Sequence, residues 1–405
     1  MNTKNVEVAV AAIARGDFVL VIDDEDRENE GDLIIAAEKA TEEKIAFMVR
    51  YTSGLICAPV EGARLDELGL PLMVLENTDS HKTAFTVSVD YVPGTTTGIS
   101  AADRAETLRA MASPATRPTD LARPGHIFPL RYREGGVLVR PGHTEAAVDL
   151  ARMAGLHPAG ALCEIVNDDG SMARGDSLRA FAAEHDIPVL TIEDLIAYRW
   201  ATEALVSREV ETDLPTEYGE FRAYGYRAGV GEPEQVALVM GDVAGRSDVL
   251  VRVHSECLTG DVLGSQRCDC RHQLMESMAQ VATAGEGVVI YVRGHEGRGI
   301  GLLSKLHAYR LQDDGVDTVD ANLQLGFAVD ARHYGPAAQI LNDLKIASVV
   351  LLTNNPAKVS GLQQLGVEVS GRKPLEMAPT ELTRDYLATK AARLGHLIGS
   401  DADGA

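Results

Sequence analysis

Three of the five cysteines in this chain lie close together, at Cys257, Cys268 and Cys270, with the spacing C-x10-C-x-C. Thiolates packed this closely are soft ligands that suit zinc, and three of them leave one coordination position open for water. An open position indicates a catalytic rather than a structural metal site. Two alternatives remain: His254 or His272 could close the site as a fourth ligand, or the cysteines could be ordinary core residues beside a loop thiol.

An acidic run extends from Asp23 to Asp32 and surrounds a single arginine, Arg27, with carboxylates. It directly follows a hydrophobic segment and ends near a glycine, where a loop would present side chains to a cleft. Crowded carboxylates repel one another, and this repulsion favours proton sharing or a divalent cation. A solvated surface loop is the plain alternative. Far down the chain, His143 and Glu164 are candidate partners of this run.

The composition narrows the class of protein. The chain has 405 residues, 45% of them hydrophobic, which fits two globular domains. Its formal net charge of -22 argues against nonspecific binding to nucleic acid or anionic membranes, so phosphate substrates would need local basic pockets. No apolar run reaches about 18 residues, and residues 1–15 lack the pattern of a signal peptide. With few, clustered cysteines, the sequence predicts a cytoplasmic protein.

The elements that must position these groups follow from apolar periodicity. We expect a mixed α/β (α+β) fold of two mixed-sheet domains in tandem, each with helices packed on its sheet. A polar stretch containing Pro215 interrupts a helical pattern over 192–206 and places the boundary near Glu209, giving domains 1–208 and 209–405. The tail at about 398–405 is expected to be disordered. The expected strands are 18–22, 54–59, 85–89, 236–239, 249–253, 287–292 and 347–352, and the expected helices are 41–50, 101–112, 273–283 and 302–314.

The segments DDEDRENEGD, TAFTVSVD, TTGISAADR, RPGHIFPL and GHTEAAVDLARMAGLHPAGALCEIVNDDG resemble 3,4-dihydroxy-2-butanone-4-phosphate synthase over nearly all of residues 5–200. The resemblance implies D-ribulose 5-phosphate as substrate, formate as a second product, and a magnesium or manganese ion held by Glu28 and His143. Such an ion stabilises an enediolate, while the carboxylates of Asp32 and Glu164 would move protons. Cys57 fits a strand pattern, and packing is its simpler role. The substrate contacts implied are Arg27, Glu28, Asp32, Arg140, Pro141, Gly142, His143, Thr144 and Glu164.

The segments RVHSECLTGDVLGSQRCDC, HEGRGIGLLSKLHAYRLQDDGVDTVDANLQLGFAVDAR, LLTNNPAK and YLATK resemble GTP cyclohydrolase II over residues 211–396. The resemblance implies that GTP loses formate and pyrophosphate to leave a diaminopyrimidine, with zinc on the three cysteines. Asp330 and Arg332 would be the acid and nucleophile pair, with Tyr309 near the reacting ring. On their own, Asp330 and Arg332 are more typical of a surface ion pair. The GTP contacts implied are Arg252, Val253, His254, Ser255, Glu256, Gln273, Glu296, Gly297, Arg298, Thr318, Thr353 and Lys358.

The second half departs from the family pattern after Cys270, where Arg271 and His272 stand in place of glycine and then proline or an aromatic residue. His272 could compete for the open metal position. On the expected helix 302–314, Lys305 adds positive charge that the acidic chain otherwise lacks. Both families imply a homodimer with small-molecule substrates, and the acidity of the chain predicts no nucleic acid and no membrane partner. The competing hypothesis is that only the first half is catalytic, with the zinc half a GTP-binding or dimer-supporting module.

Overall fold

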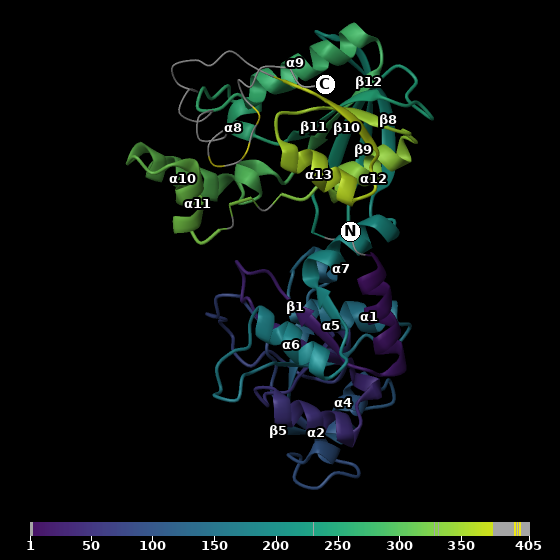
Figure 1. The fold of residues 1–405 in the computed structure, drawn as a ribbon, viewed down its shortest axis with the longest axis vertical. Helices are drawn as coiled ribbons and strands as arrows, with labels where there is room; N and C mark the ends of the chain where they lie inside the picture. Colours follow the sequence, from purple (N-terminus) through teal and green to yellow (C-terminus); the bar gives the residue numbers. More distant parts are fainter. Residues whose placement is uncertain are drawn as a thin grey trace. The chain divides into compact units, whose positions relative to one another are not determined.

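The computed structural model describes residues 3–229, 231–327, 329–330, 332–375, 393, 395 and 397, without the side chain of Thr318. The tail that the sequence predicts to be disordered lies outside these residues. The chain divides into two compact units, Met1–Arg199 and Trp200–Ala405 (Figure 1). Among the described residues, no helix is long and apolar enough to cross a membrane.

The first unit is a mixed sheet with the strand order β4-β5-β3-β6-β2-β1-β7. Side chains alternate between its two faces, so that Leu33 and Ile35 enter one core while Ile34 enters the other. Helices α2 (Glu42–Tyr51), α4 (Ala101–Ala112) and α6 (Asp176–Glu184) pack on the first of these faces, and α1 (Thr3–Arg15), α5 (His143–Met153) and α7 (Ile192–Thr202) on the second. The short α3 covers Gly62–Glu67. The strands are β1 (Val19–Ile22), β2 (Gly31–Ala36), β3 (Cys57–Glu61), β4 (Val89–Tyr91), β5 (Leu121–Tyr132), β6 (Gly160–Glu164) and β7 (Val189–Thr191).

The second unit is also a mixed sheet, with the order β14-β13-β11-β12-β10-β9-β8. Val289 faces α9 (Cys270–Ala284), whereas Val288 and Ile290 face α12 (Gly335–Asp343) and α13 (Pro356–Gln364). Shorter or outlying helices are α8 (Leu258–Asp261), α10 (Leu302–Asp313) and α11 (Thr318–Gln324). The strands are β8 (Ser207–Thr216), β9 (Gly219–Arg227), β10 (Gln235–Met240), β11 (Val249–Ser255), β12 (Gly287–Val292), β13 (Val349–Leu352) and β14 (Val369–Lys373).

The fold class predicted from the sequence is confirmed, with local differences. The predicted strand 85–89 is wrong in its position, because Phe85 forms only an isolated bridge to Leu130 and β4 begins at Val89. Helix α9 begins at Cys270 rather than Gln273, so the third cysteine is a helical residue. The polar stretch taken for a boundary forms the edge strand β8, and the two compact units divide earlier, after Arg199.

Candidate active sites

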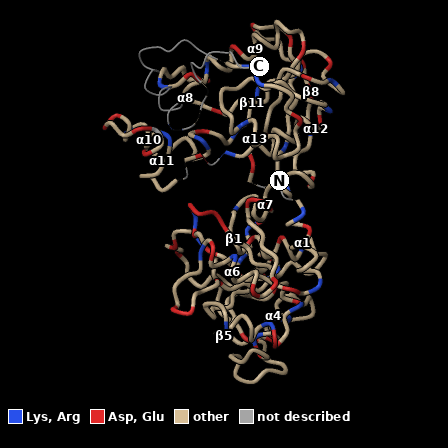
Figure 2. The backbone as a smooth tube through the Cα atoms, viewed as in Figure 1, with Lys and Arg blue, Asp and Glu red and all other residues tan. Residues whose placement is uncertain are grey.

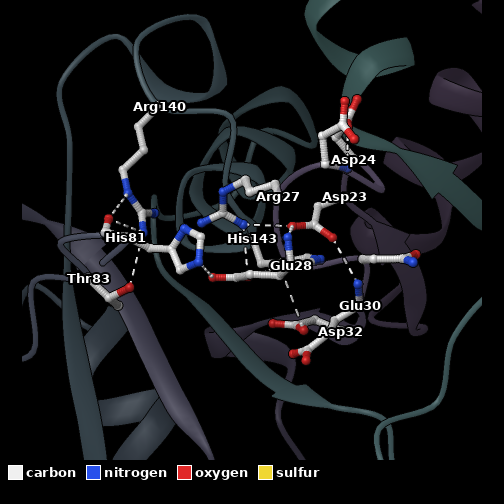
Figure 3. Close-up of polar contacts among 12 residues, drawn as sticks. Asp23, Asp24, Arg27, Glu28, Glu30, Asp32, His81, Thr83, Arg140 and His143 are labelled. Carbon is white, nitrogen blue, oxygen red and sulfur yellow. Dashed lines mark hydrogen bonds and ion pairs between the residues drawn. The ribbon is translucent and has the colours of Figure 1, made fainter. Parts of the chain in front are cut away.

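The acidic run forms the loop between β1 and β2, and Asp23 organises it. The buried Asp23 carboxylate accepts hydrogen bonds from the backbone N–H groups of Glu28 at 3.2 Å and Glu30 at 2.9 Å, and from Arg27 Nη1 at 2.8 Å (Figure 3). The acidic run is visible beside β1 in Figure 2. These bonds fix the loop, so the carboxylate of Glu28 faces the start of α5 rather than solvent.

Glu28, His143 and Asp23 together form a group that could hold a metal ion, with their ligand atoms within 4.8 Å of one another. His143 is the first residue of α5, and its Nδ1 lies 3.6 Å from Glu28 Oε2 and 3.7 Å from Asp32 Oδ1. Asp32 Oδ1 and His143 Nε2 are buried and have no hydrogen-bond partner among the described residues. Buried polar atoms are normally satisfied, so a ligand fits here, and the oxygen-rich donor set suits a hard dication.

The charges around this cluster shift the pKa of each group. Burial raises the pKa of Asp32 to about 7, although His143 opposes the shift. Burial would also raise the pKa of Glu28, but His143 and Arg27 lower it to about 2. Burial would lower the pKa of His143, but Asp32 and Glu28 raise it to about 9. The carboxylates therefore create a strongly negative potential at His143, which is the potential that a divalent cation needs.

Two carboxylates lie side by side on neighbouring strands next to this cluster. In the antiparallel ladder of β2 and β6, Asp32 is directly opposite Glu164, which places their side chains on the same face. Ser53 holds Glu164 twice, through its N–H to the Glu164 backbone carbonyl and through its Oγ to Oε2, both at 2.8 Å. The buried Cys57 packs in the core beneath, as the strand pattern predicts.

The turn before α5 supplies a fixed cation. Arg140 donates to Glu145 Oε2 at 2.6 Å, to the His81 carbonyl at 3.2 Å and to Thr83 Oγ1 at 3.1 Å. Gly142 caps α5, and a Cβ there would lie 2.5 Å from Arg140 Nη1, so a side chain would displace the guanidinium. Thr144 is buried in the first turn of α5, whereas Pro141 is exposed. The predicted residues of this half thus gather around one end of α5.

In the second unit, the three cysteines meet where β11 leads into α8 and where α9 begins. Their sulfur atoms lie within 4.8 Å of one another, and Cys257 Sγ is 3.7 Å from Cys268 Sγ. Gly260 passes so close that a Cβ there would lie 2.8 Å from Cys268 Sγ and 3.0 Å from Cys257 Sγ. The three sulfurs are buried or half-buried and lie close together, and the missing side chain of Gly260 leaves space beside them. This arrangement suits a soft divalent cation.

Neither histidine considered as a fourth ligand belongs to this cluster within the described part of the chain. His254 Nε2 instead lies 3.1 Å from both carboxylate oxygens of the buried Asp261. Asp261 also accepts a hydrogen bond from the N–H of Cys257 at 3.0 Å and from the Tyr291 hydroxyl at 2.8 Å. His272 is exposed. The arrangement of the described residues therefore favours an open site over a closed one.

The thiolate cluster lies in a cavity, and all three cysteines belong to its wall. The chain is acidic overall, yet this cavity is lined by basic groups, including the buried Arg252 and Lys358. The predicted residues that line it are Arg252, His254, Ser255, Glu256, Gln273, Gly297, Arg298, Thr353, Lys358, Tyr309 and Arg332, together with the three cysteines.

Four predicted residues are placed differently. Val253 is a buried strand residue whose carbonyl accepts from Lys358 Nζ at 2.6 Å. Glu296 is buried and is not among the described residues that line the cavity. Asp330 does not line the cavity, but its Oδ1 accepts from Arg332 Nε at 2.8 Å and its Oδ2 from Nη2 at 2.5 Å. The pair is thus a two-point ion pair that holds Arg332 at the cavity edge. The side chain of Thr318 lies outside the described part of the structure.

Three functional candidates were missed in the sequence. Asp23 was counted in the acidic run but not singled out, although it was the first carboxylate after the strand. Ser53 carried no signal beyond its hydroxyl. Lys305 was assigned only local positive charge, yet it lines the cavity and contacts Cys257.

Two family models match the chain. The model of 3,4-dihydroxy-2-butanone 4-phosphate synthase matches residues 7–198, and the model of GTP cyclohydrolase II matches residues 207–374.

Relatives match nearly the whole length. The riboflavin biosynthesis protein RibBA of Salinispora arenicola (strain CNS-205) is 60% identical over 396 residues, covering 98% of this chain and 94% of the relative. The RibBA protein of Mycobacterium tuberculosis (strain ATCC 25177 / H37Ra) is 59% identical over 404 residues, covering 98% and 95%. Among solved structures, RibBX of A. baumannii, described as a two-domain 3,4-dihydroxy-2-butanone 4-phosphate synthase, is 37% identical with a TM-score of 0.71, covering 92% of this chain and 99% of that chain.

Proposed function

The chain belongs to the RibBA family of riboflavin biosynthesis proteins, and we propose that its two clusters are the separate active sites of two reactions. The first half is a 3,4-dihydroxy-2-butanone-4-phosphate synthase, which converts D-ribulose 5-phosphate to 3,4-dihydroxy-2-butanone 4-phosphate and formate. The second half is a GTP cyclohydrolase II, which converts GTP to 2,5-diamino-6-(5-phosphoribosylamino)pyrimidin-4(3H)-one, formate and pyrophosphate.

In the synthase half, Glu28 and His143 hold Mg²⁺ or Mn²⁺, and Asp23 lies close enough to contribute. When bound, this dication stabilises negative charge that develops on neighbouring substrate oxygens. Asp32 and Glu164 face each other across the ladder, so one carboxylate can remove the proton beside the carbonyl while the other returns one.

The phosphate of the same substrate suits the end of α5. The first turn of α5, which begins at His143 and includes Thr144, presents the positive end of the helix dipole. Arg140 is held beside this turn by Glu145 and Thr83, and a guanidinium binds phosphate through paired hydrogen bonds. Arg27, fixed by Asp23, completes the substrate contacts on the loop side.

In the cyclohydrolase half, the three cysteines hold Zn²⁺. When bound, zinc activates water as a nucleophile near neutral pH. Tyr309 lies on the same cavity wall, with its hydroxyl 3.3 Å from Thr259 Oγ1, where it can orient the reacting base. An arginine is normally protonated, so Arg332 would attack the α-phosphorus only after giving a proton to Asp330, and the new N–P bond would replace the bond to the leaving pyrophosphate.

The rest of the GTP site is built around basic and amide groups. Arg298 and Lys358 provide positive charge for the triphosphate as a planar fork and a point charge respectively. Gln273 offers an amide for the guanine edge and is held by Arg252 Nη2 at 2.6 Å. The Arg271–His272 departure lies outside the cluster, so we expect it to leave the open metal position available.

The observation that carries this proposal is the presence, in one chain, of a carboxylate–histidine cluster and a three-cysteine cluster, each in its own compact unit. The alternative is a second half without catalytic activity. RibBX is an example of a two-domain relative whose description names only synthase activity. The cysteine cluster and the Asp330–Arg332 pair of this chain favour catalysis by both halves.

Selective metal removal tests both halves at once. A chelator with soft nitrogen donors, such as 1,10-phenanthroline, takes zinc but leaves magnesium. We expect it to stop formate release from GTP and to spare formate release from ribulose 5-phosphate, whereas EDTA stops both. Adding back Mg²⁺ should restore only the synthase, and zinc should then restore the second reaction. A zinc-loaded chain that releases no formate from GTP would establish the alternative.

The glycine beside the sulfurs gives a second prediction. In Gly260→Ala, the new methyl group collides with Cys268 Sγ and Cys257 Sγ and pushes the ligands apart. We expect zinc affinity to fall by about 10–100-fold, as for other changes that misplace ligands. Competition with a chromophoric chelator measures this affinity. Gly371→Ala is the matched control, because its Cβ would meet only Val350 at an ordinary 3.7 Å. Unchanged affinity in Gly260→Ala would contradict the packing assigned to the centre.

The division of the chain, its assembly and its location are further parts of the proposal. The synthase domain is taken as residues 1–208 and the cyclohydrolase domain as 209–405, and the chain is expected to be a cytoplasmic homodimer. Cysteines grouped as metal ligands rather than paired in a disulfide framework are typical of a reducing compartment. Light scattering of the purified chain would show whether it is a dimer.

A further inference from the structure

Lys305 carries a buried ammonium group that contacts the thiolate centre. It is 9% exposed, on α10, and its Nζ donates hydrogen bonds to Cys257 Sγ at 3.0 Å, to Thr259 Oγ1 at 2.8 Å and to Glu296 Oε1. A buried ammonium is costly unless it is paired and hydrogen-bonded, and here all three of its donors are used. Its position is therefore fixed against the first of the three cysteines.

Glu296 is the other half of this arrangement. One carboxylate oxygen accepts from Lys305, and the other accepts from the backbone N–H of Leu258, the residue that follows Cys257. Glu296 is 5% exposed and does not line the described cavity wall. With both oxygens engaged, its carboxylate supports the cysteine loop rather than contacting GTP, the role that the family resemblance implied.

The charge of the centre gives this contact a chemical consequence. Three thiolates carry one negative charge more than a dication can neutralise, and thiolates donate much of that charge to the metal. A cationic hydrogen-bond donor on one sulfur withdraws charge from it and strengthens the metal as a Lewis acid. Lys305 stands at that sulfur in a largely buried site, where a charged hydrogen bond is stronger than in water.

We propose that Lys305 is a positioning residue of the thiolate centre: it anchors Cys257 to Glu296 and offsets the excess negative charge of the three thiolates. This inference rests on the proposed zinc site and assigns to that site two residues, Lys305 and Glu296, that act through Cys257. Tyr309 shares the arrangement, since its ring centroid lies 5.5 Å from Lys305 Nζ. The same side chain therefore links the metal centre to the group placed beside the reacting base.

Cobalt substitution of the full-length chain tests the proposal without relying on turnover. Co²⁺ replaces zinc, and its thiolate-to-metal charge-transfer absorption reports the electron density on the sulfurs. In Lys305→Met the Cys257 thiolate loses its cationic donor, so this band should move to lower energy and zinc affinity should fall by about 10–100-fold. Lys305→Arg, which keeps the charge, should restore much of both. Arg310→Met removes one exposed charge from the same helix and should match the native chain.

A native band and native zinc affinity in Lys305→Met overturn the proposal, as does an equal change in Arg310→Met. If circular dichroism shows that Lys305→Met does not fold, Lys305→Gln gives the same comparison with a polar side chain. Failure of the native chain to take up either metal would sink the proposed zinc site itself.

Glu296→Gln separates the two roles of the carboxylate. Support of the cysteine loop predicts a shifted cobalt band in the absence of GTP. A guanine contact predicts a native band and only a raised KM for GTP, and that result would overturn the assignment of Glu296.

Discussion

Replacing Cys268 by serine is expected to remove the metal from the thiolate centre and to stop GTP turnover, while ribulose 5-phosphate is still converted. Cys268 is buried with its sulfur 3.7 Å from Cys257 Sγ, and a serine hydroxyl is a harder and far less acidic group than a thiol. Without activated water, kcat for formate release from GTP should fall by about a thousandfold or more. Elemental analysis of the dialysed variant and formate assays with each substrate measure the two effects.

His272→Ala is the matched control for this substitution. His272 is exposed, lies only a few residues from Cys268 in the chain, and stands outside the metal-binding group. We therefore expect native zinc content and native GTP turnover in this variant. Loss of zinc from His272→Ala would make it a fourth ligand and the centre a closed one. Full zinc occupancy in Cys268→Ser would remove Cys268 from the ligand set.

The cluster of three cysteines could be predicted because its members are close together in the sequence. Cys268 and Cys270 are two residues apart at the start of α9, and Cys257 lies just before α8, so short segments bring the three sulfurs together. Lys305 is 48 residues from Cys257 and reaches it only through the packing of α10 against α8 and the cysteine loop. Nothing in the run HEGRGIGLLSK distinguishes the lysine that contacts sulfur from one that faces solvent, so the sequence predicted its charge but not its partner.

The same difference between local and long-range information explains which strands could be predicted. Buried β-branched runs such as 287–292 were predictable because packing and sequence pattern agree there. Strand β8 was missed because Ser207–Pro215 is exposed throughout and reads as a polar linker, although its backbone pairs with β9. An edge strand needs a partner for its backbone and none for its side chains, and Pro215 near the end of an edge strand is tolerated.

The register of the strand pairs could not be predicted from the sequence either. Asp32 is opposite Glu164 because of the way β2 pairs with β6, and no local sequence pattern determines that pairing. The resemblance to the synthase family named both carboxylates, but only the ladder shows that they lie side by side on one face of the sheet. The role of Asp23 could not be predicted for a related reason. Its carboxylate accepts hydrogen bonds from backbone N–H groups of the loop that it begins, and these contacts depend on the loop conformation.

Replacing His143 by alanine should abolish formation of the butanone phosphate and leave GTP turnover unchanged. His143 is the first residue of α5 and lies close to Glu28 and Asp32, so its loss removes a proposed metal ligand and the group that faces both carboxylates. We expect kcat with ribulose 5-phosphate to fall by about a thousandfold, within the range for losing a positioned acid–base or charge-stabilising group. His157→Ala, which removes an exposed histidine paired with Glu38 beyond the other end of α5, should retain native activity.

Magnesium titration of His143→Ala separates the two parts of this effect. If His143 acts as a ligand alone, a saturating concentration of Mg²⁺ or Mn²⁺ should recover much of the lost rate, with an apparent Kd raised by about 10-fold or more. A rate that stays low at saturation would mean that the imidazole also orients or protonates the substrate. Loss of GTP turnover in the same variant would contradict independent sites, because the two units have separate hydrophobic cores and His143 belongs to the first.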